Sequence, residues 1–285
     1  MMSTSEPVRV LFVGDRPVCA GLVEVIRAAG DEVVGLGLNS PPRPGGAHVR
    51  AATGVDPDRV FYGRSFSGGI ALRRFGALQP HLGVSCGFAP ILPTSMLKLP
   101  QWGWVNVHRS YLPYNRGLDP LQWALVDGTP AGVSLHVMTE EVDAGPIIAQ
   151  AEMPLKPTDD FDALEARADR LVQELFTSAW PRLRTGDLDG TPQDEDLATY
   201  HTWADCRALR QLDLQATMKV RRVVDILRAY SGDGWSFVEM RLGLDPFPYQ
   251  VGASVVPTAA VGRAKDRRDG EDDAGAERGP GIGET

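Results

Sequence analysis

The chain has 285 residues, of which 43% are hydrophobic, enough for one large or two modest domains. Its formal net charge is −8, whereas a phosphate backbone calls for a basic surface, so we expect no nucleic-acid partner. Its three cysteines lack disulfide spacing, its N-terminus is short and polar, and no apolar run is long enough to span a membrane. We therefore expect a cytoplasmic protein without a membrane partner.

The first elements alternate between strand and helix patterns. Residues 8–14 are typical of a buried strand, residues 18–29 have apolar side chains at helical spacing, and residues 32–36 form a second strand-like run. This order predicts an α/β fold with a doubly wound, mostly parallel sheet. Gly14 stands outside any Gly-x-Gly-x-x-Gly pattern, so we do not expect a dinucleotide at this turn.

The stretch from Gly103 to His108 alternates small or polar residues with apolar ones. It predicts the end of a strand on which Asn106 and His108 share one face. Turn-forming residues follow, so the pair should lie where the strand opens into a loop, the place where α/β sheets bind ligands. The dipeptide Asp119-Pro120 then predicts the start of a helix, and Gly128 predicts its end.

A second alternating run, residues 132–138, leads into a loop over 139–146 that contains Asp143, and a further strand is predicted over 147–150. Neighbouring strands of this kind would bring Asp143 to Asn106 and His108. An amide, an imidazole and a carboxylate are suited to moving an acyl carbon onto an amine. We expect no metal site, because no His-x-x-x-His or Cys-x-x-Cys spacing is present.

These motifs resemble, in order and spacing, the signature of the 10-formyltetrahydrofolate-dependent formyltransferases. The matching residues are 106–108, 112–113, 116–117, 132–136 and 143–150. The resemblance implies a Rossmann-like fold of the formyltransferase type and transfer of a formyl group from 10-formyltetrahydrofolate to a primary amine. It assigns catalysis to Asn106, His108 and Asp143. His136 also matches a family position, and we expect it to support the pocket.

The chemistry of these groups suggests their roles. The Asn106 amide and a protonated His108 would donate to the oxygen on which negative charge develops. Asp143 would hold the imidazole in one tautomer or accept a proton through a water.

The segment 83–93 resembles the folate side of the family's active site, and the loop 139–145 would form the opposite wall. Glycine and proline expose backbone groups there, and apolar side chains suit the faces of a pterin ring. The expected folate-binding residues are Cys86, Gly87, Phe88, Ile91, Leu92, Val142 and Asp143.

The second half of the chain begins with a long amphipathic helix, predicted over 160–184, which should cover one face of the sheet. An acidic stretch over 190–199 is predicted to be a linker. We expect a catalytic domain over 1–190, a small helical and hairpin appendage over 200–258 and a disordered tail over 262–285. Within the appendage, helices are predicted over 206–214 and 217–230, and a hairpin is predicted from 235–240 and 249–251.

Parts of the appendage, residues 209–214 and 227–230, resemble the C-terminal part of nucleotide-sugar N-formyltransferases, the branch of the family that the chain is most like. The resemblance implies a nucleotide-linked amino sugar, such as a dTDP sugar, as the substrate, and a homodimer. The expected substrate-binding residues are Arg109, Tyr111, Arg116, Arg228 and Trp235. Arg109 would contact a substrate phosphate or face solvent, and the appendage arginines could equally be solvated.

Three alternatives remain open. One is formylation of another small amine, such as a hydroxylated ornithine. A second is glycinamide ribonucleotide, which is disfavoured because Gly14-Asp15-Arg16-Pro17 stands where the purine enzyme carries its phosphate loop. The third is a protein that binds folate or a nucleotide sugar without catalysis, which the intact Asn106, His108 and Asp143 disfavour.

Overall fold

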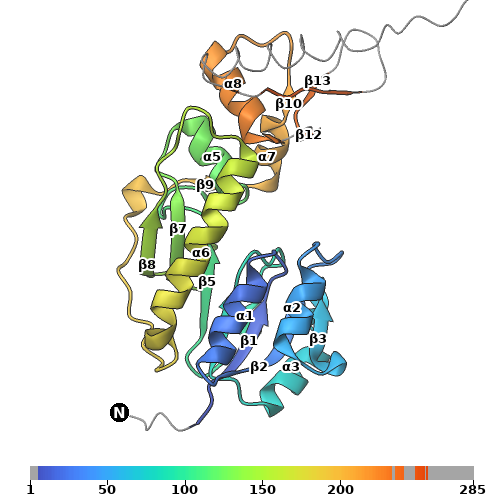
Figure 1. Ribbon diagram of the computed structural model, residues 1–285, viewed down its shortest axis with the longest axis vertical. Coiled ribbons are helices and arrows are strands. Elements are labelled where there is room, and N and C mark those ends of the chain that lie inside the picture. The colour runs from blue at the N-terminus through green and yellow to red at the C-terminus, as the bar shows by residue number, and fades with distance from the viewer. Residues whose placement is uncertain (1–5, 233–234, 241–247, 254, 256–285) are drawn as a thin grey trace, which may run out of the picture.

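The protein is built on a seven-stranded sheet (Figure 1). The structure, a computed structural model, describes residues 6–232, 235–240, 248–253 and 255. The strand order is β3-β2-β1-β4-β5-β7-β8. In chain order these strands are β1 (Arg9–Val13), β2 (Glu32–Leu38), β3 (Val60–Tyr62), β4 (Leu82–Ser85), β5 (Trp104–His108), β7 (Gly132–Val137) and β8 (Ile147–Glu152).

The first five of these strands are parallel, and the last two are antiparallel to their neighbours. The predicted doubly wound, mostly parallel sheet is therefore confirmed. The strand order reverses between β1 and β4, where Val13 pairs with Ser85. A side chain at Gly14, which has a φ of 136°, would collide with the Cys86 carbonyl, so this close approach requires glycine. Ligand sites of such sheets lie beside such a reversal, at the carboxyl ends of the strands.

Helices cover both faces of the sheet. Alternate residues of β1 point to opposite faces, so Val10 and Phe12 join one apolar cluster, and Leu11 and Val13 join the other. The first cluster includes α1 (Cys19–Ala28), α2 (Gly46–Thr53), α5 (Pro120–Asp127) and α6 (Phe161–Leu183). The second includes the short η2 (Gly63–Ser67), α3 (Gly69–Ala77) and α4 (Thr94–Leu97). One further turn, η1 (Pro57–Arg59), precedes β3.

The long helix α6 confirms the amphipathic pattern predicted over 160–184. Asp160 caps it by accepting a hydrogen bond of 2.9 Å from the Ala163 N–H. Its buried residues recur every three or four positions, from Leu164 to Leu183. Figure 1 shows that α6 runs along the sheet and that its first turns lie beside the appendage.

The appendage departs from the predicted boundaries. The helix predicted over 206–214 is α7 (Trp203–Leu209), because Thr202 and Asp205 form a capping box that starts it earlier. The helix predicted over 217–230 is α8 (Val220–Ala229). The acidic segment 190–199 contains the turn η3 (Glu195–Leu197), and β9 (Tyr200–His201) pairs with β6 (Arg116–Gly117).

The remaining strands of the appendage are short. They are β10 (Gln211–Leu212), β11 (Ser231–Gly232), β12 (Trp235–Ser236), β13 (Glu239–Met240) and β14 (Tyr249–Gln250). The antiparallel pair β13–β14 matches the predicted hairpin, although its connection lies outside the described residues. The predicted tail over 262–285 also lies outside them. Ile226, Ala229 and Tyr230 join the main apolar cluster, so α8 packs directly on the sheet domain.

No helix in the described ranges is both long and apolar enough to cross a membrane.

Candidate active site

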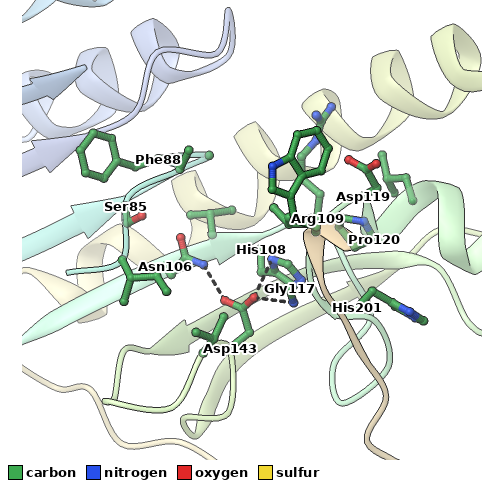
Figure 2. A pocket seen from close by; sticks show the side chains of 18 of the residues that line it. Ser85, Phe88, Asn106, His108, Arg109, Gly117, Asp119, Pro120, Asp143 and His201 are labelled. Atoms are coloured by element: carbon green, nitrogen blue, oxygen red, sulfur yellow. Dashed lines mark hydrogen bonds and ion pairs between the residues drawn. The ribbon is translucent and has the colours of Figure 1, made fainter. Parts of the chain in front are cut away.

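A cavity of about 510 Å³ opens at the carboxyl ends of β4 and β5. One wall comes from the segment after β4, a second from the loop between β7 and β8, and a third from the start of α5 and the appendage. Asn106, His108 and Asp143 all line it (Figure 2). The cavity therefore lies where the strand pattern predicted a ligand site.

His108 is buried near the end of β5, on the same face as Asn106. Its Nε2 atom lies 3.1 Å from the Asn115 carbonyl oxygen. Because a carbonyl can only accept, Nε2 carries the hydrogen in this contact. The other ring nitrogen, Nδ1, lies 3.6 Å from Oδ2 of Asp143, so Nδ1 is the nitrogen free to exchange a proton.

The carboxylate of Asp143 lies close to the other polar groups of the site. It has a φ of 55°, and its Oδ2 accepts a hydrogen bond of 2.9 Å from the Gly117 N–H. Its Oδ1 lies 3.3 Å from Nδ2 of Asn106 and 3.4 Å from Nε2 of His136. Figure 2 shows Asn106 and His108 converging on this carboxylate from β5. The three predicted catalytic residues are thus brought together.

The surroundings keep Asp143 ionised. Burial by itself would raise the pKa of this carboxyl group. The positive charge available at His108, the hydrogen bond and charge of His136, and the Gly117 N–H together outweigh burial. The pKa of Asp143 is consequently held well below its ordinary range, and the group is a weak base.

His136 lies opposite Asn106 on the adjacent strand β7. Its Nδ1 faces the Val137 carbonyl at 3.0 Å, and its Nε2 lies 3.2 Å from Nδ2 of Asn106. The ring is buried. These contacts match the supporting position expected for His136, because they fix the Asn106 amide and the Asp143 carboxylate.

The acidic segment 190–199, predicted to be a linker, also fixes the loop that carries Asp143. Nε2 of Gln193 donates to the carbonyls of Asp143 and Gly145, each at 2.8 Å. Sequence reasoning missed Gln193, because nothing in a polar segment marks one amide as a support for a distant loop.

Most of the expected folate residues line the cavity. These are Gly87, Phe88, Ile91, Leu92, Val142 and Asp143. Cys86 is not among the lining residues. It is fully buried, and its carbonyl accepts from the Cys19 thiol at 3.4 Å. The chain turns sharply at Gly87, which has a φ of 70°, so Cys86 lies behind the cavity wall.

Arg109 lines the cavity, but its guanidinium is engaged by α6. Nη1 lies 3.0 Å from Glu165 Oε1, and Nη2 lies 2.9 Å from Asp169 Oδ1. Burial and the neighbouring Arg16, which also pairs with Glu165 at 2.7 Å, lower the pKa of Arg109. Arg109 therefore does not face solvent, and both ends of its guanidinium already have partners.

Three other expected substrate residues do not line the cavity, and a fourth, Trp235, cannot be compared with it. Tyr111 and Arg116 are absent from its lining, and Arg116 instead binds Gln193 and Glu195. Arg228 pairs with Asp225 at 2.8 Å and donates to backbone carbonyls before α6. Trp235 belongs to β12, and its side chain lies outside the described part of the structure.

Different appendage residues line the cavity instead. The guanidinium of Arg210 lies 5.3 Å from the ring centre of Trp203 and 5.6 Å from that of Tyr230. Trp203 is 67% exposed although it borders the cavity. The sequence shows a tryptophan directly after Thr202, but its place at the cavity depends on the pairing of β6 with β9.

Within the described ranges, no group of three or more His, Cys, Asp or Glu side chains is placed to hold a metal ion.

Comparison with known proteins connects this geometry to a family. Residues 70–180 match the family model described as formyl transferase. A methionyl-tRNA formyltransferase from Chloroflexus aurantiacus is 32% identical over 199 residues, which is 67% of this chain and 64% of that relative. The aligned part of this chain thus spans less than two thirds of that relative's length.

Two solved structures share the fold. A sugar N-formyltransferase from a Shewanella species superposes with a TM-score of 0.75 at 20% identity, covering 88% of this chain and 99% of the other. The formyltransferase PseJ from Anoxybacillus kamchatkensis, solved with a formylated UDP sugar and tetrahydrofolate, has a TM-score of 0.52 at 22% identity, covering 70% and 88%. The matched segment 70–180 contains Asn106, His108 and Asp143. Together with the 32% identity to a methionyl-tRNA formyltransferase over 67% of this chain, this match shows that the chain belongs to the formyl transferase family.

Proposed function

We propose that the protein transfers the formyl group of 10-formyltetrahydrofolate to the primary amine of a nucleotide-linked amino sugar, with a dTDP sugar as the first candidate. The observation that carries the proposal is the convergence of Asn106, His108 and Asp143 on one cavity. The structural likeness to sugar N-formyltransferases supports this choice of acceptor.

The cavity fits a folate. Phe88 and Leu92 on one side and Met138 and Val142 on the other offer apolar walls to a flat ring. The turn at Gly87 leaves backbone groups near the ring edge. Bound there, the folate would supply an activated one-carbon acyl group next to Asn106.

Asn106 would stabilise the oxygen of the formyl group. Both of its N–H groups face protein partners, His136 at 3.2 Å and Asp143 at 3.3 Å, and its carbonyl points away from Asp143 (Figure 2). Both contacts are longer than the usual 2.9–3.0 Å of such hydrogen bonds, so they are weak. One of these N–H groups can therefore be exchanged for a substrate oxygen at small cost.

His108 would handle the proton. With Nε2 committed to the Asn115 carbonyl, Nδ1 either donates to the substrate oxygen or takes up the proton that the attacking amine loses. That proton ends on N10 of tetrahydrofolate as the bond between N10 and the formyl carbon breaks. In both roles the nearby Asp143 carboxylate balances the positive charge of the ring. Because the lowered pKa of Asp143 makes it a weak base, we assign it orientation and charge balance rather than proton storage.

The acceptor would enter from the appendage side. Trp203 offers a face for a nucleobase, and Arg210 offers a cation for phosphate oxygens. Trp203 and Arg210 are thus our candidates for nucleotide recognition at this cavity.

Methionyl-tRNA is a second candidate acceptor, because the matching sequence relatives carry that activity in their names. The net charge of −8 disfavours it. A binding titration with initiator tRNA at two salt concentrations distinguishes the candidates, since a tRNA enzyme would bind more tightly at low salt.

The direct test is to incubate the protein with 10-formyltetrahydrofolate and a panel of nucleotide-linked amino sugars. Release of tetrahydrofolate and a product heavier by one formyl group, both absent with His108→Ala, are the expected results. Folate binding without release for every amine would favour the binding-protein alternative. A thermal-shift screen across nucleoside diphosphates identifies the nucleotide, because a ligand that binds only the native state raises the melting temperature.

A further inference from the structure

The first turn of α5 carries two polar side chains that the mechanism does not use. Asp119 and Gln122 are three residues apart, so they lie on one face of the helix, and both line the cavity. Tyr230 from the end of α8 lines the cavity beside them. This group lies across the cavity from the folate walls, on the side where the acceptor would enter.

Gln122 borders the cavity and is otherwise enclosed by protein. It is 8% exposed, and within the described ranges its amide is not engaged by another side chain. An amide at a cavity wall keeps its hydrogen-bonding capacity for whatever occupies the cavity, and it is left unpaired when an apolar group takes that place. Its two donors and its acceptor are therefore available to a molecule in the cavity.

The side chain of Asp119 does not cap its own helix, although Asp119 stands at the N-cap position. It stands at the N-cap of α5, where an aspartate normally accepts a hydrogen bond from its own helix, but no such bond forms. Its backbone is left-handed, with a φ of 51°, and Oδ2 instead accepts from the Tyr230 hydroxyl at 3.1 Å. Burial and the neighbouring Asp119 charge raise the pKa of Tyr230, so the phenol stays protonated and donates.

We infer that Asp119 and Gln122 recognise hydroxyl groups of the acceptor next to its reactive amine, with Tyr230 positioning Asp119. A carboxylate oxygen accepts from one hydroxyl, and an amide both donates to and accepts from another. The negative charge of Asp119 disfavours a phosphate at this point. A purely apolar group, such as a thioether side chain, would leave Gln122 unpaired, so the pair selects a polyhydroxylated amine.

This inference rests on the proposed formyl transfer, and two kinds of measurement keep the two ideas apart. The probes are a nucleoside-diphosphate-linked 4-amino-4,6-dideoxyhexose and its analogue without the hydroxyl beside the amine. Initial rates with 10-formyltetrahydrofolate give kcat/KM for each probe. Calorimetry without folate gives the affinity of each probe independently of turnover.

The variants are chosen to keep the fold. Asp119→Asn retains a residue that tolerates the left-handed backbone. Gln122→Met keeps the volume and removes only polar atoms that have no protein partner, so its melting temperature should not fall. Gln215→Met is the matched control, because Gln215 is exposed and lies outside the cavity.

The expected result is that the wild type and Gln215→Met prefer the hydroxylated probe by roughly 10- to 100-fold, as for a hydrogen bond that leaves a buried group unpaired when lost. In Gln122→Met or Asp119→Asn this preference should fall toward unity. An unchanged preference in both variants, with turnover intact, overturns the inference but leaves the formyl transfer standing. Hydroxyl-dependent binding that the variants lose, without turnover by the wild type, supports the inference and overturns the proposed function.

Discussion

Replacing Asp143 with asparagine tests the role of its carboxylate in the site. In the wild type, Oδ2 accepts from the Gly117 N–H, and Oδ1 faces the Asn106 amide. The asparagine can keep one oxygen toward Gly117, but its NH₂ group then meets Nδ2 of Asn106, donor against donor. Asn106 must rotate its carbonyl toward residue 143, and His108 loses the carboxylate that lies 3.6 Å from its Nδ1.

The expected loss of activity follows from the distance between His108 and the Asp143 carboxylate. A unit positive charge on His108 at 3.6 Å from the carboxylate gains about 4 to 5 kcal/mol at an effective dielectric constant of about 20. Desolvation and the remaining hydrogen bonds offset a part of this energy. With about 1.4 kcal/mol for each factor of ten, the expected fall in kcat/KM is on the order of 10²- to 10³-fold.

The assay is tetrahydrofolate release under saturating folate, with Asp196→Asn as a control at an exposed position. The control should keep the wild-type rate, and the Kd for folate should change little in Asp143→Asn. A loss of less than about tenfold in kcat/KM would refute the assigned role, because it would mean that no charge develops on His108 during the rate-limiting step.

Asn106, Arg109 and the titration of Asp143 offer separate tests. Asn106→Ala should lower kcat by about 10²-fold or more while folate binding stays nearly unchanged, since it removes a donor that acts on developing charge; a rise in KM alone would contradict this. Arg109→Met should lower the free energy of unfolding by about 1 to 3 kcal/mol, because Glu165 and Asp169 lose their shared cation, and unchanged stability in a denaturant titration would contradict this. The folded-state pKa of Asp143 is depressed, so its contribution to the free energy of unfolding is present above about pH 4 and is lost as the pH falls through the folded-state pKa. The difference in free energy of unfolding between the wild type and Asp143→Asn should therefore be smaller at about pH 2 than at about pH 6. A difference that grows on acidification would contradict the depressed pKa.

The parallel half of the fold could be predicted because local patterns determine it. The run Arg9–Val13, the helix α1 and the strand β2 are each specified by their own apolar spacing. The appendage was harder. Its elements are two to ten residues long, and α7 begins where Thr202 and Asp205 cap it, three residues before the predicted start. In such short elements, capping and packing against α5 and α6 outweigh periodicity.

Some residues of the candidate site were likewise predictable from local patterns, whereas others depend on contacts between distant segments. The face shared by Asn106 and His108 was predictable from strand alternation, and Asp143 followed from the order of the loops. Arg116 and Arg228 were expected to bind substrate from the resemblance to the family, but each is paired inside the protein. A sequence shows that an arginine is present, and only the fold shows which carboxylate reaches it first. Gln122, Trp203 and Arg210 reach the cavity through pairings between segments that no local pattern encodes.

A single-turnover reaction of the protein with 10-formyltetrahydrofolate and a nucleotide-linked amino sugar, followed by mass spectrometry of the sugar, tests the proposed formyl transfer directly. We predict a formamide product from the wild type, reduced at least a hundredfold in Asn106→Ala and Asp143→Asn. Formamide formation at the wild-type rate in those variants would contradict the account.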